Sequence, residues 1–382
     1  MGAAMPVEGL ALVRMGLGVA LIALLPLAWV WLRRRGADTR LRLAALTALT
    51  LFLTFDLVVF GSFTRLTDSG LGCPDWPGCY GQASPLAAHD EIHAAQTALP
   101  SGPVTFTKAW IEMIHRYLAM TVGLLIVVLA LASWSEARAG RRLPLSPWWP
   151  TLTLAWVVLQ GLFGRYTVTL KLYPAVVTLH LLGGLTLLAL LAWQHQGYRQ
   201  RPLVLSPGLA RRATGVLALL VLQVALGGWV SSNYAVLACS GFPQCNGAWW
   251  PAMDFGQGFT LLRELGGAGH GGYMTQEGLV AIHWAHRLFA LVALAALFWL
   301  AAALRREDDA GARRYGTGLA LLALAQLASG LSNVVLGWPI AAALGHSAGA
   351  AALVALLVSL LARAVQRRSR PEGDPVVGGL PA

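Results

Sequence analysis

The stretch Gly61-Ser-Phe-Thr-Arg-Leu-Thr-Asp-Ser-Gly-Leu-Gly-Cys73-Pro-Asp-Trp-Pro-Gly-Cys79 has a counterpart later in this chain. The counterpart, at an offset of 166 residues, is Gly227-Gly-Trp-Val-Ser-Ser-Asn-Tyr-Ala-Val-Leu-Ala-Cys239-Ser-Gly-Phe-Pro-Gln-Cys245. Each copy starts at the end of an apolar segment and closes with a Cys-x5-Cys pair. Two copies of so long a motif indicate an internal duplication, a common construction in membrane proteins.

The repeat extends to four histidines. The segment from Gln160 to His180 returns as Gln326 to His346 at the same offset. Glu112-Met-Ile-His115-Arg116 returns as His283-Trp-Ala-His286-Arg287, shifted by five more residues because the second loop is longer. The two halves therefore carry histidines in register.

The composition, 57% hydrophobic and 12% charged residues, excludes a soluble protein. A helix needs roughly 20 apolar residues to cross about 30 Å of hydrocarbon. We expect spans near 10–32, 43–61, 110–133, 149–168, 175–193, 213–231, 279–304, 316–336 and 341–362. The predicted fold is an all-α polytopic membrane protein with nine spans, eight of which form two pseudo-symmetric four-helix bundles.

Four regions follow from this pattern. Residues 1–42 hold an extra N-terminal transmembrane helix and a basic inner loop, 43–198 the N-terminal bundle, 199–370 the C-terminal bundle, and 371–382 a flexible cytoplasmic tail. The first apolar run is followed by Arg33-Arg34-Arg35 and shows no small-residue cleavage site. It is therefore interpreted as a retained span and not as a signal peptide.

The basic residues predict the orientation, because Lys and Arg accumulate on cytoplasmic loops. Clusters at 33–42, 138–142, 199–212, 305–314 and 363–370 contain 20 of the 28 basic residues. This places the N-terminus outside and the C-terminus inside a bacterial cell (inner) membrane. The net charge of +11 is then mostly a topology signal, with some attraction to anionic lipid, and does not indicate nucleic-acid binding.

All four cysteines fall in the two long loops, about 62–109 and 232–278, that this topology places outside. Thiols there meet an oxidising environment, so Cys73–Cys79 and Cys239–Cys245 are predicted to be local disulfides. Each closes a short loop and contributes about 2–3 kcal/mol by the loop-length relation. A zinc clip is the weaker alternative because zinc sites favour closer spacing, and a redox role for the first pair stays open.

Histidines at membrane depth are costly and therefore indicate function. The four histidines lie near the outward ends of their spans, and imidazoles from facing helices of a bundle form axial pairs for haem iron. We expect His115 to pair with His180 and His286 to pair with His346. Glycines beside them, Gly183-Gly184, Gly345 and Gly349, would admit a flat macrocycle or close helix packing. No Cys-x-x-Cys-His motif is present, so any haem would be b-type.

The halves differ at Glu112, whose place before His115 corresponds to that of His283 before His286. Residues i and i+3 share a helix face, so Glu112 is expected to point toward whatever His115 binds. It would then take part in proton transfer or, in the plainer alternative, pair with Arg116 or a loop residue. His283 is a further histidine on the face of His286 and a rival ligand, an electron-path residue or a packing residue.

The chain resembles the haem A synthases over roughly residues 43–362. The likeness rests on the stretch from Gly61 to Cys79, on Glu112-x-x-His115-Arg116, and on the later histidines His180, His286 and His346. It implies oxidation of a methyl group of haem O to a formyl group by successive hydroxylations. It further implies substrate haem O at His115 and His180, a haem b cofactor at His286 and His346, and catalysis by Glu112.

Further expectations concern partners and the propionates. Arg65, Arg116, Arg165 and Arg287 are candidate propionate contacts or interface anchors. A haem O synthase, cytochrome oxidase assembly factors and an unnamed electron donor are the expected partners in the bilayer. A di-haem cytochrome oxidising quinol and a haem transporter are the alternatives. The first has no need of Glu112 in one half only, and the second usually shows broken helices or charged midplane cavities.

Overall fold

The computed structural model describes residues 7–264 and 274–368, and helices account for the regular structure of these ranges. The long helices are α1 (Val7–Arg33), α2 (Thr39–Leu66), α4 (Phe106–Arg138), α5 (Trp148–Thr169), α6 (Pro174–Arg199), α7 (Leu209–Ser232), α9 (Gln276–Arg305), α10 (Ala310–Val335) and α11 (Ile340–Arg368). The loops after α2 and α7 contain α3 (His89–Ala98), the 3-10 turn η1 (Ala235–Leu237) and α8 (Phe255–Gly258). The expected tail, 371–382, lies outside the described residues.

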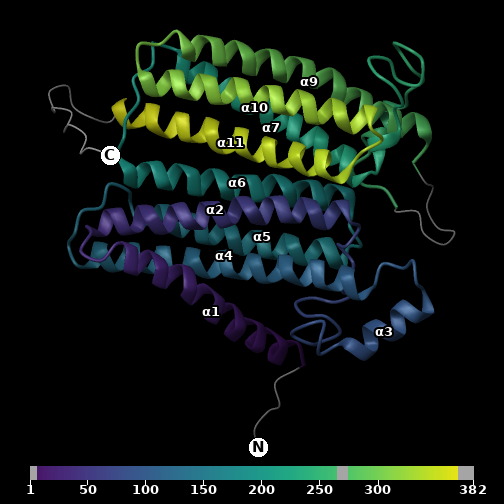
Figure 1. Ribbon diagram of the computed structural model, residues 1–382, viewed down its shortest axis with the longest axis horizontal. Coiled ribbons are helices and arrows are strands. Elements are labelled where there is room, and N and C mark those ends of the chain that lie inside the picture. Colours follow the sequence, from purple (N-terminus) through teal and green to yellow (C-terminus); the bar gives the residue numbers. More distant parts are fainter. Residues whose placement is uncertain (1–6, 265–273, 369–382) are drawn as a thin grey trace, which may run out of the picture.

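Within the described ranges, eight of these helices are long and apolar enough to cross a membrane, which confirms a polytopic membrane protein. The helix that falls short is α5, whose sequence includes Gln160, Arg165 and several threonines. It nevertheless lies alongside α4 and α6 in the N-terminal bundle (Figure 1). The ninth span stays a prediction.

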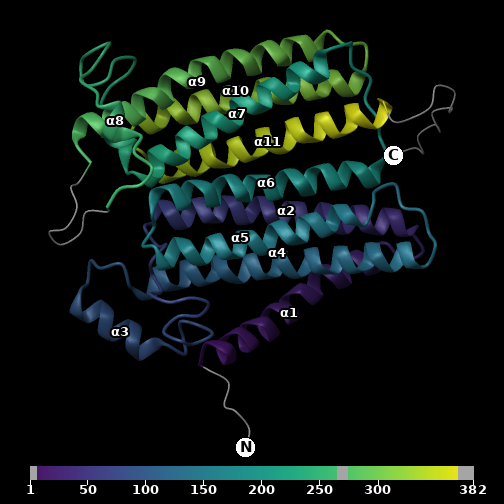
Figure 2. The ribbon, with the colours of Figure 1, turned by 180° about the vertical axis from the view of Figure 1, so that it is seen from behind.

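The long helices form two groups of four, with α6 at the centre. α2, α4, α5 and α6 pack together, as do α7, α9, α10 and α11, and α6 also contacts α7 and α11 (Figures 1 and 2). α1 runs obliquely along the outside of the first group and contacts α4 and α2. The two groups match the predicted bundles, although their boundary at residues 198 and 199 stays a prediction.

Local backbone features recur between the groups at the offset of the sequence repeat. The two cysteine loops each contain an isolated bridge, Cys79 with Gln82 and Cys245 with Ala248. Left-handed backbone at Tyr80 and Gly81 is matched by left-handed backbone at Asn246 and Gly247. Such matches are expected from a duplication, which remains an inference from the sequence.

The interior of each bundle is aliphatic and closely packed. Leu125, Ile126 and Leu129 of α4 are fully buried in the first bundle, and Leu300 and Leu357 are fully buried in the second. Polar side chains inside must find partners because no water reaches them. The hydroxyls of Thr47, Thr50 and Thr54 on α2 do so by donating to the carbonyl four residues earlier.

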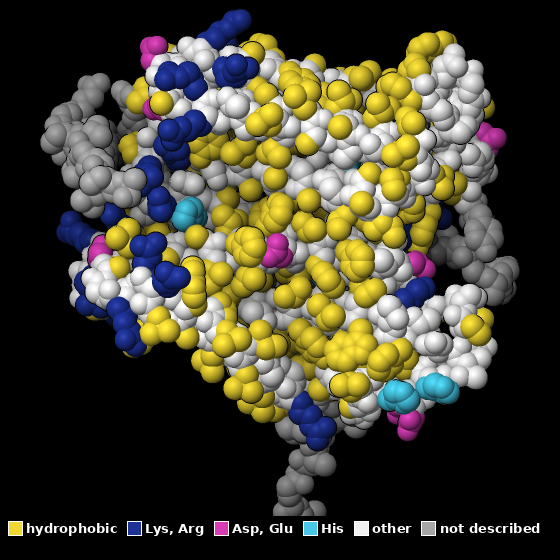
Figure 3. Space-filling view, viewed as in Figure 1, with side chains coloured by type: hydrophobic (Ala, Val, Ile, Leu, Met, Phe, Trp, Pro, Cys, Tyr) yellow, Lys and Arg dark blue, Asp and Glu magenta, His cyan; other side chains and the backbone are white. Residues whose placement is uncertain are grey.

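The two ends of the bundles differ in chemistry. Lys and Arg side chains gather at the end opposite α3 and the cysteine loops, while hydrophobic side chains cover the face between the ends (Figure 3). This separation agrees with the predicted cytoplasmic and outer ends. The four histidines of the repeat lie toward the end with the cysteine loops, near the starts of α4, α6, α9 and α11.

Candidate functional site

The structure brings together the members of each predicted histidine pair. His115 on α4 and His180 on α6 are electrostatic neighbours in the first bundle. His286 on α9 and His346 on α11 are neighbours in the second. Each pair therefore comes from two helices of one bundle, the arrangement that an axial pair needs.

Each of these four rings rests against a glycine of an adjacent helix. A Cβ added to Gly61 of α2 would lie 2.9 Å from Nε2 of His115, and one added to Gly227 of α7 would lie 3.1 Å from Cε1 of His286. The other two pairs obey the same pattern: Gly164 lies against His180 and Gly330 against His346, with the corresponding distances 3.5 and 3.2 Å. The role of these glycines was not evident from the sequence, although Gly61 and Gly227, and likewise Gly164 and Gly330, are in register in the repeat.

Two glycines that were expected to make room for a macrocycle, Gly183 and Gly349, instead lie against glutamine side chains. A Cβ on Gly183 would lie 1.7 Å from Nε2 of Gln160, and one on Gly349 would lie 2.2 Å from Nε2 of Gln326. The Gln326 amide also donates to the His346 carbonyl at 2.8 Å. Both glycines therefore make room for a glutamine side chain, and in the second bundle this side chain also bonds to the helix that carries His346.

Glu112 is buried, and its carboxylate faces the first cysteine loop. Oε2 accepts a hydrogen bond from the backbone N–H of Cys73 at 2.8 Å, and Oε1 is ion-paired with Arg116 one turn later. The expected pairing with Arg116 and a loop residue is therefore present. Through these bonds the carboxylate connects the helix that carries His115 to the disulfide loop.

His283, the residue in the place of Glu112, has both ring nitrogens engaged. Nδ1 lies 2.9 Å from the carbonyl of Ala235, and Nε2 accepts from Nε of Arg287 at 3.1 Å. This is the neutral imidazole with its proton on Nδ1. With no free lone pair on the ring, His283 is a packing and hydrogen-bonding residue here, and the ligand role of His286 stays a prediction.

Arg116 and Arg287 hold the cysteine loops, because their guanidinium groups donate hydrogen bonds to backbone carbonyls of these loops. Arg116 donates to Pro77 at 3.1 Å and also to Gly78. Arg287 donates to the carbonyls of Cys239, Gly241 and Gln244 at 3.0, 3.0 and 3.3 Å. The guanidinium groups of Arg116 and Arg287 thus already have hydrogen-bond partners in the loops. Their expected contact with haem propionates stays a prediction.

Arg65 contributes to the contact between the bundles. It donates to the Ser231 carbonyl at 2.7 Å and its guanidinium lies 4.0 Å from the centre of the Tyr234 ring. Burial raises the pKa of Tyr234 despite the nearby Arg65 cation, so the phenol stays protonated and donates to Asp68 at 3.2 Å. The fourth candidate, Arg165, lies 5.9 Å from the centre of the Trp76 ring in the first cysteine loop.

Both predicted disulfides are present. Cys73 and Cys79 are bonded with Cα atoms 5.0 Å apart, and Cys239 and Cys245 with Cα atoms 4.8 Å apart. Nowhere in the described part of the chain do three or more His, Cys, Asp or Glu side chains form a group that could hold a metal ion. The zinc alternative for the cysteines therefore lacks a site among these residues.

The histidine pairs fit a haem better than a bare ion. Iron in a porphyrin needs only two axial ligands from the protein, and each bundle supplies two imidazoles backed by glycines. The Nδ1 atom of His180 is buried without a hydrogen-bond partner among the described residues, so this ring is not held in a closed hydrogen-bonded contact.

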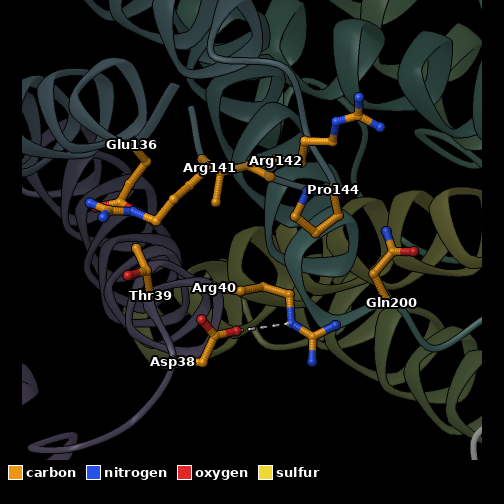
Figure 4. A pocket seen from close by; sticks show the side chains of 9 residues that line it. Asp38, Thr39, Arg40, Glu136, Arg141, Arg142, Pro144 and Gln200 are labelled. Atoms are coloured by element: carbon orange, nitrogen blue, oxygen red, sulfur yellow. Dashed lines mark hydrogen bonds and ion pairs between the residues drawn. The ribbon is translucent and has the colours of Figure 1, made fainter. Parts of the chain in front are cut away.

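A surface pocket at the arginine-rich end is lined mainly by charged and polar side chains and contains no histidine. It is lined by Asp38, Thr39, Arg40, Glu136, Arg141, Arg142, Leu143, Pro144 and Gln200 (Figure 4). Its charges pair within it, since Asp38 lies 4.0 Å from Arg40 and Arg141 donates to Glu136 at 2.8 Å. It lies at the other end of α4 from His115 and takes no part in the histidine sites.

Comparison with known proteins identifies the lineage. The profile of the cytochrome oxidase assembly protein family, COX15-CtaA, matches residues 44–358. This chain belongs to that family. A Heme A synthase of Shewanella oneidensis is 36% identical over 324 residues, which are 84% of this chain and 96% of that protein. The Heme A synthases of Methylorubrum extorquens (strain PA1) and Sphingopyxis alaskensis are each 30% identical, covering 86% and 84% of this chain and 89% and 91% of their own lengths.

The COX15-CtaA match covers both histidine pairs and both cysteine loops and begins after α1. The family assignment therefore rests on the two bundles, and α1 is an addition outside the matched region. α1 packs beside the first bundle, where Met15 joins the buried cluster around Cys73, Cys79 and Met113.

Proposed function

We propose that this chain is a membrane oxidoreductase that converts haem O to haem A, the cofactor of terminal oxidases. One observation carries the proposal: each bundle brings two histidines together near the same end, and among the described residues the helix of the first pair carries a buried carboxylate, Glu112, three residues before His115, where the second bundle has His283 before His286. Membership of the COX15-CtaA family and the names of its relatives favour this reaction over electron transfer from quinol and over haem transport.

The two pairs have different roles in this proposal. His115 and His180 hold the substrate haem O, whose methyl group is oxidised to a formyl group. Each of two hydroxylations adds one oxygen atom and takes two electrons from the methyl carbon to an oxidant from outside the chain, and the resulting hydrated aldehyde loses one water. His286 and His346 hold haem b, which when bound supplies reversible one-electron chemistry. A glycine at each of the four rings leaves room for the imidazole against the neighbouring helix.

Glu112 is proposed to hold and move a proton at the substrate site. Each hydroxylation removes electrons from the methyl carbon, and protons must move with them. The Arg116 cation and the Cys73 N–H hold the carboxylate in place, and Arg116 balances its charge at a depth where a lone carboxylate would be costly. The first disulfide loop thereby positions the residue that we assign to catalysis.

The enzyme is proposed to lie in a bacterial cell membrane with its N-terminus outside and its C-terminus in the cytoplasm. Both histidine pairs then lie in the outer half of the bilayer. A haem O synthase is the natural source of the substrate, and oxidase assembly factors are the natural recipients of the product. An electron donor completes the set of partners.

The test is to express the chain in a host that makes haem O and to identify the extracted haems by chromatography and mass. The wild type should contain haem A or its hydroxylated precursor. Glu112→Gln keeps the shape and an acceptor for the Cys73 N–H, and Glu112→Ala removes both; each should yield unmodified haem O. Glu136→Gln, at the far end of the same helix, is the matched control and should behave as the wild type. Haem b alone in every sample would overturn the proposal.

A further inference from the structure

Both histidines of the second bundle have a side-chain partner at Nδ1. Ser329 of α10 has its Oγ 3.0 Å from Nδ1 of His346. Gln223 of α7 has its amide 3.1 Å from Nδ1 of His286. Each partner comes from a helix other than the one that carries the ring, so it can fix the orientation of the ring.

The serine contact also selects the tautomer of His346. The Ser329 hydroxyl donates to the carbonyl of Ala325 at 2.7 Å, which leaves Oγ to accept from an N–H. The proton of His346 is then on Nδ1, and Nε2 keeps the lone pair that a metal needs. Such a bond also makes the imidazole a more basic ligand.

Gln223 can act in the same way on His286. Its Nε2 atom lies 3.1 and 3.4 Å from the two ring nitrogens, while its Oε1 atom is buried without a partner. A half-turn of the amide exchanges these atoms: it gives Oε1 the Nδ1–H that it lacks, and it gives up the 3.3 Å hydrogen bond that Nε2 donates to the His286 carbonyl. A haem bound at Nε2 of His286 would favour this arrangement, because the proton must then be on Nδ1.

The first bundle has apolar residues at both corresponding places. At the offset of 166 residues, Gln223 corresponds to Leu57 and Ser329 corresponds to Phe163. Leu57 packs with the aliphatic core of the bundle. In keeping with the loss of the serine, Nδ1 of His180 is buried without a hydrogen-bond partner.

We propose that Ser329 and Gln223 are positioning residues that make the second histidine pair a permanent haem site, and that Leu57 and Phe163 leave the first pair an exchangeable one. The inference rests on the proposed function, which needs a retained cofactor and a substrate that leaves as product. Partners of metal-bound histidines typically change metal affinity by about 10–100-fold. A difference of that size separates a resident haem from one in transit.

The test measures retention of haem b in the purified full chain, using excess apomyoglobin as the acceptor. Ser329→Ala and Gln223→Leu should release haem b about 10–100-fold faster than the wild type. They should also raise its midpoint potential, because a less basic imidazole stabilises ferric iron less. Ser329→Thr, which keeps a hydroxyl, should restore both properties. Ser332→Ala, one turn along α10 with its hydroxyl bonded only to Ala328 in the described contacts, is the control.

The reverse exchange tests the first bundle. Phe163→Ser and Leu57→Gln should increase the amount of haem O or haem A that purifies with the protein and should slow product release, whereas Phe163→Ala, which makes a similar cavity without a hydroxyl, should not. Unchanged release rates and potentials in Ser329→Ala and Gln223→Leu would overturn the inference. A wild type that retains haem b but makes no haem A would overturn the proposed function alone.

Discussion

Glu112 and Arg116 are a buried ion pair whose remaining bonds go to the first cysteine loop. The equivalent pair in the second bundle, His283 and Arg287, is held in the same way but has a neutral imidazole in place of the carboxylate. Removal of the cation therefore has unequal consequences. A buried carboxylate that loses its cation lowers the free energy of unfolding far more than a neutral imidazole that loses the same partner.

Arg116→Met should consequently lower the free energy of unfolding by about 3–5 kcal/mol, and Arg287→Met by about 1–3 kcal/mol. Denaturant unfolding in detergent measures both losses. Adding Glu112→Gln to Arg116→Met should recover part of the first loss, because no uncompensated charge remains. Equal losses in the two single variants would contradict the buried ion pair.

The glycine at each histidine gives a second residue-scale prediction. Gly61→Ala places a Cβ 2.9 Å from Nε2 of His115 and should displace the ring, which lowers substrate haem binding about tenfold or more. Gly123→Ala, where a Cβ meets nothing within 4 Å, is the control and should bind normally. Spectral titration with haem O measures both. Normal binding by Gly61→Ala would show that the ring does not depend on this close approach.

The sequence predicted which residues belong to the site better than it predicted which residues they contact. The histidine pairs and disulfides follow from the repeat and from compartment chemistry. The helix-face rule placed Glu112 toward the ligand of His115, but its carboxylate bonds to Cys73 and Arg116, because the loop returns over the helix end. Ser329 and Gln223 were missed because ordinary polar residues show their role only once α7 and α10 are set against the rings.

At the scale of the element, Asp309 ties the start of α10 to the segment before α7. Its carboxylate accepts from the backbone N–H groups of Gly311 and Ala312, as a helix N-cap does, and from that of Val204. Burial raises the pKa of Asp309, but these three donors and Arg363 outweigh it, so the pKa lies below its ordinary value of 3.8. The cap is therefore a charged one.

Asp309→Ala should lower the free energy of unfolding by about 1 kcal/mol at neutral pH. Since the folded pKa is depressed, this contribution is complete above the unfolded value of 3.8 and is lost as pH falls through the folded pKa. Thermal unfolding in detergent should therefore show a lower melting temperature for the variant than for the wild type at neutral pH, and this difference, the gap, should narrow below about pH 4. Asp308→Ala, at an exposed neighbour, should show no gap; a gap that widens in acid would refute the assignment.

The long helices were predictable because roughly 20 apolar residues in a row have few alternatives. The ends of these helices were harder to predict, because helices continue past the hydrocarbon. The span expected at 341–362, for example, is helical over Ile340–Arg368. α3 was missed because a short polar helix in a loop has no membrane signal. α5 was expected from the apolar run at 149–168, but it is not among the helices apolar enough to span a membrane, because its sequence includes polar residues such as Gln160 and Arg165.

At the scale of the whole molecule, the topology depends on α5. If α5 crosses the membrane, the chain has nine spans, and the segments 139–147 and 170–173 lie on opposite sides. All four cysteines of the chain are disulfide-bonded, so an engineered thiol can be read without background. Arg142→Cys should react with an impermeant maleimide only after the cells are opened, and Leu170→Cys should react in intact cells. Labelling of both from one side would mean that α5 does not cross.

The bundles are joined at the end with the cysteine loops by polar contacts as well as by α6. Arg65 bonds to Ser231, Thr178 lies 3.2 Å from Ser232, and Tyr234 bonds to Asp68. These bonds cluster beside the histidine pairs, where the relative placement of the two sites matters most. None of them was evident from the sequence, because each partner is an ordinary surface residue of its own bundle.

The position of all four histidines near one end of the bundles has an energetic consequence for coupling to the membrane potential. A charge that crosses the bilayer exchanges about 2.3 kcal/mol for every 100 mV. In the proposed reaction, an electron that passes from a haem at His286 and His346 to a substrate at His115 and His180 would move sideways, at nearly constant depth, and would gain or lose almost none of this energy. Turnover in energised vesicles should therefore match turnover after an uncoupler is added, so that this oxidation step runs at the same rate in a resting and a fully charged cell.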